Sequence, residues 1–214
     1  MKHLDKKQQM IVLISALTAK SDVGNLKTAL NEALDAGLTI NEIKEELNHL
    51  YAYCGFAASI RGLMTLRDVL EERQAKGIND EIGKDASPID DNGSKYERGE
   101  EAQVLVTGQT AEQLKTNFNG LSPFMDVLLK EHLFADLFGR DILTYVEREL
   151  TTVSALASMH EPMVQSHFHG ALNVGVTEQQ LRELLFIIEE NIGKAEAETG
   201  RAILNGVLAS RANA

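Results

Sequence analysis

The amino-acid sequence predicts an all-α protein made of two similar helical units that pack as one compact body. Only three prolines interrupt 214 residues, and apolar residues recur at three- and four-residue spacing along several segments. A pattern of the first half also returns 138 residues later, because Ala33–Thr39 reads ALDAGLT and Ala171–Thr177 reads ALNVGVT. One such unit cannot cover its own apolar faces, so we expect the two to pack together.

Each unit is expected to contain a helical hairpin followed by a third helix. The periodicity predicts helices over 8–19 and 23–36 in the first unit, and over 145–159 and 162–174 in the second. Glycine should end the second helix of each pair, at Gly37 and Gly175. The pairs Thr39 with Glu42 and Thr177 with Gln180 have the spacing of a capping box, and they predict the start of the third helix.

The stretch between the units is polar and rich in turn-forming residues over 74–92, which indicates a linker. We therefore divide the chain into a first unit at 1–75, a linker at 76–93 and a second unit at 94–214. The second unit is expected to open with a helix over 96–106. Thr110 and Gln113 predict a short capped helix, and Ser122-Pro123 should open a longer amphipathic helix that runs to Phe138.

The charge and cysteine content exclude several classes of function. The net charge of −11 repels phosphate backbones and anionic lipids, so neither nucleic acid nor a membrane surface is an expected partner. No apolar run approaches the roughly 20 residues that span a bilayer. A single cysteine, Cys54, cannot form a disulfide within the chain, and a cytoplasmic location is the simplest expectation.

Several segments resemble the carboxymuconolactone decarboxylase family, which includes the alkylhydroperoxidase D-like proteins. The resemblance lies in RELTTVSAL from Arg148, in HFHGALNVGVT from His167, and in YCGFAA from Tyr53, which follows EEL at Glu45. It implies a compact helical fold and a homo-oligomer, which could be a dimer, trimer or hexamer. It also implies either lactone decarboxylation, a lyase activity, or thiol-based peroxide chemistry, and it indicates no cofactor.

Two departures from the family pattern limit these activities. The alkylhydroperoxidase branch has a Cys-x-x-Cys pair before its histidine, whereas the matching stretch here, 160–163, reads HEPM and has no thiol. The histidine and the Tyr-Cys-Gly of a single-unit decarboxylase are also divided between the two units. The first unit keeps Tyr53-Cys54-Gly55 but has Ala29 in the place of the histidine, and the second keeps His167 but has Asn191-Ile192-Gly193.

The strongest catalytic candidate is His167, which should face Glu149 on the preceding helix. A carboxylate beside an imidazole fixes its tautomer and suits general acid–base work. Cys54 is a second candidate, although a lone cysteine on an apolar helix is usually a small core residue. We expect Cys54 and Tyr53 to line the pocket. His167 and His169 are two residues apart and do not have the spacing of helical metal ligands, so no metal site is expected.

Charged residues of the second unit are candidates for holding a substrate carboxylate. Arg148, next to Glu149 in an apolar helix, is the first choice, because a buried charge is costly unless it is well bonded. Arg140 and His132 are expected on one face of a helix. Arg140 could bind a carboxylate through two hydrogen bonds, or could form an ion pair with Asp136.

Three functional hypotheses follow from these candidates. The first is a decarboxylase-like enzyme that acts on a small anionic lactone or carboxylate by His/Glu acid–base chemistry. The second is a thiol-dependent, peroxiredoxin-like activity in which Cys54 attacks the peroxide, which requires a reachable thiol of depressed pKa. The third is a non-catalytic helical assembly protein whose site has decayed.

Overall fold

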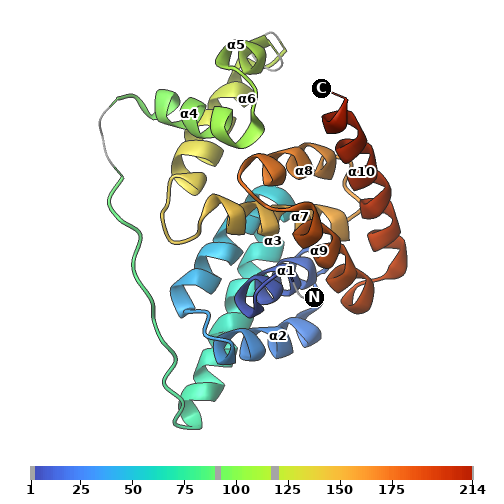
Figure 1. Ribbon diagram of the computed structural model, residues 1–214. Helices are drawn as coiled ribbons and strands as arrows, with labels where there is room; N and C mark the ends of the chain where they lie inside the picture. The colour runs from blue at the N-terminus through green and yellow to red at the C-terminus, as the bar shows by residue number, and fades with distance from the viewer. Residues whose placement is uncertain (1–2, 90–92, 117–120, 214) are drawn as a thin grey trace.

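The all-α prediction is confirmed by the computed structural model, which describes residues 3–89, 93–116 and 121–213 (Figure 1). These residues form helices and loops, and no strand occurs among them. The helices are α1 (Lys6–Lys20), α2 (Val23–Asp35), α3 (Ile40–Ala75), α4 (Lys95–Thr107), α5 (Ala111–Leu114), α6 (Pro123–Val127), η2 (Leu128–Phe138), α7 (Tyr145–Ser158), α8 (Val164–Asn173), α9 (Glu178–Asn191) and α10 (Lys194–Ala212). None of the described helices is long and apolar enough to cross a membrane.

Capping boxes set the start of most of these helices. The three that the sequence predicts, at Thr39, Thr110 and Thr177, are all formed. In each box the hydroxyl accepts from the backbone amide three residues on, and the Glu or Gln at that position accepts from the amide of the cap residue. Further boxes at Asp5, Ser94 and Thr144 begin α1, α4 and α7.

The two helical hairpins end in the same way. Leu38 N donates to Ala33 O at 3.0 Å in the first, and Val176 N donates to Ala171 O at 2.9 Å in the second. Gly37 and Gly175, with φ values of 90° and 105°, make these turns, as the sequence predicts. The origin of the two halves in one duplicated unit stays a prediction.

The third helix of each half turns sharply back on itself. In α3 the turn is at Gly55, where Ser59 Oγ donates to Leu47 O at 2.7 Å across twelve residues. A straight helix would separate these residues by about 18 Å. In the second half the chain breaks at Gly193, between α9 and α10. In the sequence, Gly193 follows Gly55 by 138 positions, the same offset as the repeated pattern.

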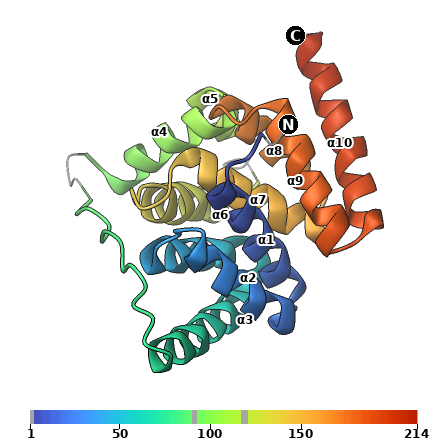
Figure 2. The same ribbon diagram turned by 60° about the horizontal axis from the view of Figure 1, so that its bottom comes forward.

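One core joins the two halves of the chain. α1 packs on α7 as well as on α2 and α3. α1 and α7 lie near the middle of the molecule (Figures 1 and 2). The main apolar cluster draws residues from both halves, such as Ile14 and Leu47 from the first and Leu150 and Phe168 from the second. A smaller cluster of Ala102, Val106, Phe134 and Phe138 joins α4 to η2.

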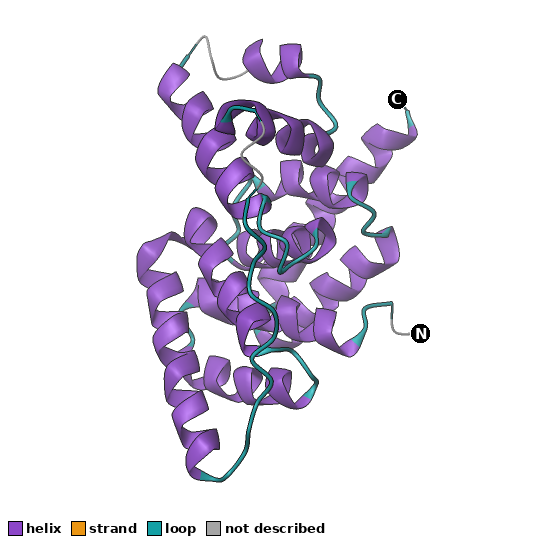
Figure 3. Ribbon diagram, turned by 90° about the vertical axis from the view of Figure 1, so that its left-hand side faces the viewer, coloured by secondary structure: helices purple, strands orange, loops and turns teal. Residues whose placement is uncertain are grey.

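The segment between α3 and α4 is extended and runs along one side of the molecule (Figures 1 and 3). It is held at both ends of its described part. Ile40 N donates to Glu81 O and Asn41 N to Ile82 O, each at 2.9 Å, and Ser87 donates twice to the carboxylate of Asp141. The predicted linker therefore lies at the same position in the sequence as this loop. The division of the chain into domains stays a prediction.

One predicted helix boundary and one predicted shared helix are wrong. Pro162 does not open the hairpin helix but lies in a turn before α8, which begins at Val164. The helix expected from Ser122 to Phe138 is formed as α6 followed by the π-helix η2, and Arg140 lies just beyond its end. His132 and Arg140 therefore do not share one helix, because Gly139 ends η2.

Candidate functional site

The predicted pair of His167 and Glu149 is formed, between α8 and α7. His167 Nδ1 lies 3.1 Å from Glu149 Oε2, and the Glu149 side chain is completely buried while that of His167 is 19% exposed. An ionised carboxylate can only accept a hydrogen bond, so Nδ1 carries the hydrogen in this pair. The other ring nitrogen, Nε2, is then the one with a free lone pair, which is the arrangement of a general base.

Gly170 makes room for this pair. A Cβ atom at Gly170 would lie 3.2 Å from Glu149 Oε2 and 3.4 Å from Val106 Cγ1, so the missing side chain leaves space for the carboxylate. Gly170 follows His167 by three residues on α8 and therefore lies on the same side of the helix. The local sequence thus provides both the imidazole and the gap in which its partner sits.

Tyr53, from the first half of the chain, contacts His167 of the second half. The two rings meet edge to face, with centroids 5.2 Å apart and an interplanar angle of 87°. The Tyr53 hydroxyl is buried, and burial together with the charge of Glu149 raises the pKa of Tyr53. Tyr53 therefore stays protonated and supports the imidazole. The tyrosine kept by the first half and the histidine kept by the second half are thus in contact.

Behind this contact lies a buried network around His49 of α3. Arg148 Nη1 lies 3.2 Å from His49 Nδ1, and His49 Nε2 lies 3.0 Å from Thr152 Oγ1. A guanidinium can only donate, so Nδ1 accepts and Nε2 donates to Thr152. Burial and the positive charge of Arg148 lower the pKa of His49, which keeps the ring neutral.

The two arginines expected to hold a substrate carboxylate hold Glu45 instead. Arg148 Nη2 donates to Glu45 Oε1 at 2.7 Å and Arg140 Nε donates to Glu45 Oε2 at 2.8 Å. Arg148 is completely buried. The alternative pair of Arg140 with Asp136 is also wrong, because Asp136 binds Lys95 and His132. Since Glu45 is buried as well, the arginines neutralise a charge that folding removes from water.

His167 lines a cavity of about 270 Å³ between α4, α5, η2 and α8. Most of the surrounding side chains are apolar, and among the described residues that line it none is Asp, Glu, Lys or Arg. They are Gln103, Val106, Thr107, Gln109, Leu114, Leu129, Leu133, Phe134, Met163, Ser166, His167 and Gly170. The cavity therefore combines one imidazole with an uncharged, largely apolar wall, which is typical of small-molecule sites.

The remaining predicted site residues do not line this cavity. Cys54 packs against the main core and its Sγ donates to Leu50 O at 3.1 Å. Burial raises the pKa of the Cys54 thiol to about 11, so the depressed pKa that a peroxidatic cysteine requires is not found. The His132 side chain is 50% exposed and contacts Asp136.

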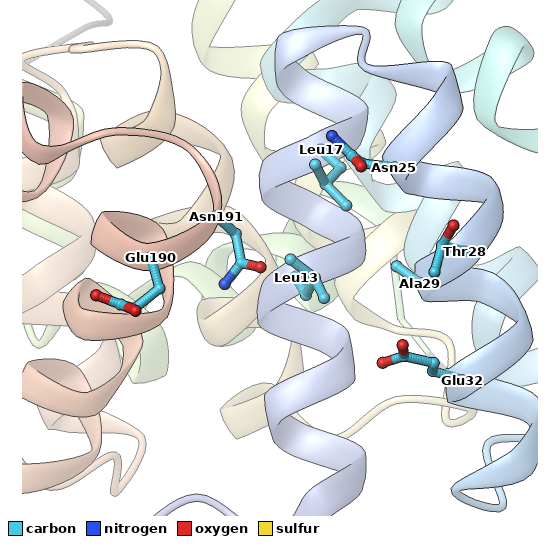
Figure 4. Close-up of a pocket in the computed structure, with 8 residues that line it drawn as sticks. All are labelled: Leu13, Leu17, Asn25, Thr28, Ala29, Glu32, Glu190 and Asn191. Atoms are coloured by element: carbon cyan, nitrogen blue, oxygen red, sulfur yellow. The ribbon is translucent and has the colours of Figure 1, made fainter.

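A second cavity, of about 300 Å³, lies between α1, α2 and α9 (Figure 4). Two of its residues are Ala29, which stands where the first unit lacks the family's histidine, and Asn191, which stands where the second lacks the tyrosine. Figure 4 shows Leu13 and Leu17 of α1 between Ala29 on α2 and Asn191 on α9. Among its described lining residues this cavity has no histidine and no tyrosine.

Sequence reasoning missed His49, Thr152 and Gln103. His49 follows Glu45 by one helical turn, and two polar residues on one face of a buried helix are a usable signal. Gln103 stands alone between apolar neighbours and gives no such signal. Among the described residues, no three His, Cys, Asp or Glu side chains gather in a way that could hold a metal ion.

Comparison with known families bears on the same part of the chain. Residues 127–205 match the model of the carboxymuconolactone decarboxylase family. The matched segment contains both Glu149 and His167 and runs from the end of α6 into α10. No curated protein matches the chain significantly.

Proposed function

Since residues 127–205 match the model of the carboxymuconolactone decarboxylase family, we propose that the chain is a small-molecule enzyme that works by proton transfer. His167 is the acid–base group and Glu149 is its positioning partner. The observation that carries the proposal is the 3.1 Å contact between these side chains at the wall of a cavity. The activity is of the lyase type that the family's name describes.

The proton moves at Nε2 of His167. This nitrogen takes a proton from the substrate, the imidazolium that results is stabilised by Glu149 and exchanges its proton with solvent, and it returns a proton in a later step. General acid–base catalysis of this kind contributes a factor of roughly 10² to 10⁴.

A single composite site explains the divided motifs better than decay does. Tyr53 from the first half and His167 with Glu149 from the second are in contact, whereas the described lining of the cavity beside Ala29 and Asn191 contains neither a tyrosine nor a histidine. If the site had decayed, the buried pair of Glu149 and His167 would lack a reason to persist, because burying a carboxylate is costly. The contact therefore favours an enzyme over a purely structural assembly.

The thiol-dependent alternative has weaker support. Cys54 does not line the cavity, and its hydrogen bond to Leu50 O and its raised pKa both favour the unreactive thiol. Peroxide chemistry at Cys54 would also need an external thiol as reductant. Cys54→Ser is expected to leave the activity of the His167 site unchanged within about twofold.

The proposal is tested by hydrogen exchange at a carbon next to a carbonyl. The wild-type protein and His167→Ala are incubated in D₂O with γ-phenyl-γ-butyrolactone and with the sodium salt of 5-oxotetrahydrofuran-2-carboxylic acid. Deuterium incorporation is followed by NMR. The wild type should accelerate exchange in one probe, and His167→Ala should lose a factor of roughly 10² to 10⁴ of that acceleration. His169→Ala is the matched control, because His169 does not line the cavity.

Thermal unfolding of the same variants separates catalysis from folding. His167→Ala should stay folded at ambient temperature, with a midpoint lowered by up to about 10 °C because the buried Glu149 carboxylate loses this partner. Unfolding of His167→Ala at ambient temperature would make His167 structural and would count against the proposal. So would equal exchange rates for the wild type and the variant.

A further inference from the structure

The side chain of Gln103 has an unused hydrogen-bonding atom at the cavity wall. Gln103 lies on α4, is only 3% exposed, and its Oε1 atom is buried without a hydrogen-bond partner among the described residues. The nearby hydroxyl of Thr107 does not serve it, because Thr107 Oγ1 donates to the backbone oxygen of Gln103 at 2.7 Å. An unsatisfied buried acceptor costs about 1–3 kcal/mol and calls for a partner.

The position of Gln103 points to that partner. Gln103 and His167 line the same cavity from two different helices, α4 and α8. A molecule in the cavity would therefore meet a hydrogen-bond acceptor from α4 and the imidazole from α8. Engineered cavities of about 150 Å³ bind benzene, so a cavity of about 270 Å³ holds a single ring with substituents.

The charges around the cavity select the class of molecule. The buried cations nearest in the chain are already neutralised: Arg148 binds Glu45, and Lys130 binds Glu100 and Asp126. Arg211 lines an adjacent hollow with His169 and donates to Asn173 Oδ1 at 2.9 Å. An anion in the cavity would thus find no free cation among the described lining residues, and it would be repelled by Glu149 behind His167.

We propose that this cavity binds an uncharged, largely apolar ring compound with a hydroxyl or N–H group, and that Gln103 accepts the hydrogen bond from that group. This ligand class makes the proposed function more specific. It rests on the proposed function only for the role of His167. It replaces the anionic substrate expected from Arg148 and Arg140. Binding itself is a separate observable and does not require turnover.

Three probes of similar size separate charge from hydrogen bonding: benzyl alcohol, ethylbenzene and benzoate. Their dissociation constants are measured by ligand-observed NMR with the full chain. Wild type should bind benzyl alcohol about 3–10 times more tightly than ethylbenzene, as one added hydrogen bond provides. Benzoate should bind more than tenfold more weakly than the alcohol.

Gln103→Leu should abolish the preference for the alcohol while ethylbenzene binds at least as well as before. Gln179→Leu is the matched control, because Gln179 is exposed on α9, away from the cavity. Gln103→Met gives a second reading if the leucine variant does not fold. The comparison of the three probes on wild type needs no variant at all.

Benzoate binding as tight as that of benzyl alcohol would overturn the inference, and so would an alcohol preference that survives Gln103→Leu. Absence of binding by all three probes at millimolar concentration would overturn it too. These failures are distinct from failure of the proposed function. If His167-dependent exchange occurs only in the lactone carboxylate, the acid–base proposal stands and the uncharged ligand class is wrong. If benzyl alcohol binds as expected but no probe shows exchange, the ligand class stands and the acid–base proposal is wrong.

Discussion

At the scale of single residues, Glu46 shows how burial turns an acid into a neutral side chain. It is completely buried in α3, where Ser15 Oγ donates to its Oε1 atom at 2.7 Å and its Oε2 atom has no partner among the described residues. Burial raises the pKa of Glu46 well above its ordinary value, and Glu147 adds to the effect. The folded state therefore holds this proton more tightly than the unfolded state does.

The sign of the resulting pH dependence is fixed by linkage. Above the unfolded pKa of roughly 4.3, the unfolded chain releases the Glu46 proton while the folded chain keeps it, so stability falls as pH rises. Glu46→Gln mimics the neutral acid and removes this penalty. We expect its midpoint of thermal unfolding to exceed that of wild type by about 2–6 °C at pH 8 and by less than about 1 °C at pH 4, just below the unfolded pKa. Calorimetry at both pH values measures the difference.

Glu183 is the control for this prediction, because its environment acts in the opposite direction. Partial burial opposes ionisation of Glu183, but the backbone amides of His3 and Leu4 outweigh it and lower the pKa of the carboxyl. Glu183→Gln should therefore lower the midpoint at pH 8 and lose that effect as pH falls through the folded pKa. A midpoint for Glu46→Gln below wild type at pH 8 would contradict the neutral assignment.

At the scale of elements, the bend of α3 depends on the backbone at Gly55. This residue has φ 81° and ψ 162°, a region that is essentially restricted to glycine. The bend presents Tyr53, just before it, to His167 and lets the rest of α3 fold back along the first half. A straight helix would carry the residues after Gly55 away from Leu47 and leave less of the chain to cover the core.

Gly55→Ala tests this dependence without a steric complication. A Cβ atom at Gly55 would have nothing within 4 Å, so only backbone strain acts, and we expect a loss of about 1–3 kcal/mol in the free energy of unfolding. Urea denaturation measures it. The activity of the His167 site should fall in parallel, because Tyr53 supports the imidazole.

Gly206→Ala is the matched control in α10. A Cβ there also has nothing within 4 Å, but the residue is helical and exposed, so alanine should stabilise the chain by about 0.5–1 kcal/mol. If both substitutions changed stability by the same amount, the bend would not depend on the conformation of Gly55.

At the scale of the whole molecule, buried charges connect the two halves of the chain. Glu45 of α3 binds Arg148 of α7 and Arg140 of the loop before it, and all of these contacts join residues about a hundred positions apart. A buried ion pair adds little net stability compared with apolar residues, but removal of one partner leaves the other buried and uncompensated. The network therefore makes correct docking of the halves a condition for folding.

Arg148→Met should consequently lower the free energy of unfolding by about 3 kcal/mol, and Glu45→Gln combined with Arg148→Met should recover a large part of the loss. Guanidinium denaturation of the two single variants and the double variant measures the coupling. Arg182→Met, which breaks exposed contacts with Glu178 and with Asn205 Oδ1, is the control and should change stability by less than about 0.5 kcal/mol. Strict additivity of the Glu45 and Arg148 substitutions would refute the coupling.

Homo-oligomer formation stays a prediction, for analytical ultracentrifugation to test.

Most of the helical architecture could be predicted from the sequence. Capping boxes at Thr39, Thr110 and Thr177 and the glycines that end the hairpins act through hydrogen bonds between residues a few positions apart, so the local sequence is enough to identify them. The contact between His167 and Glu149 was also predictable, because both lie on consecutive helices of one hairpin.

Only the tertiary structure decided which of the other charged and polar groups meet. The sequence could not assign Glu45 to Arg148 and Arg140, nor bring Tyr53 to His167, because these pairs are formed by docking of distant helices. The sequence also could not predict that Gln103 lies unpaired beside an uncharged cavity. That outcome depends on which partners the neighbouring hydrogen-bond donors have in the folded chain. The helices follow from short-range hydrogen bonding, whereas the chemistry of the site follows from which side chains burial brings together.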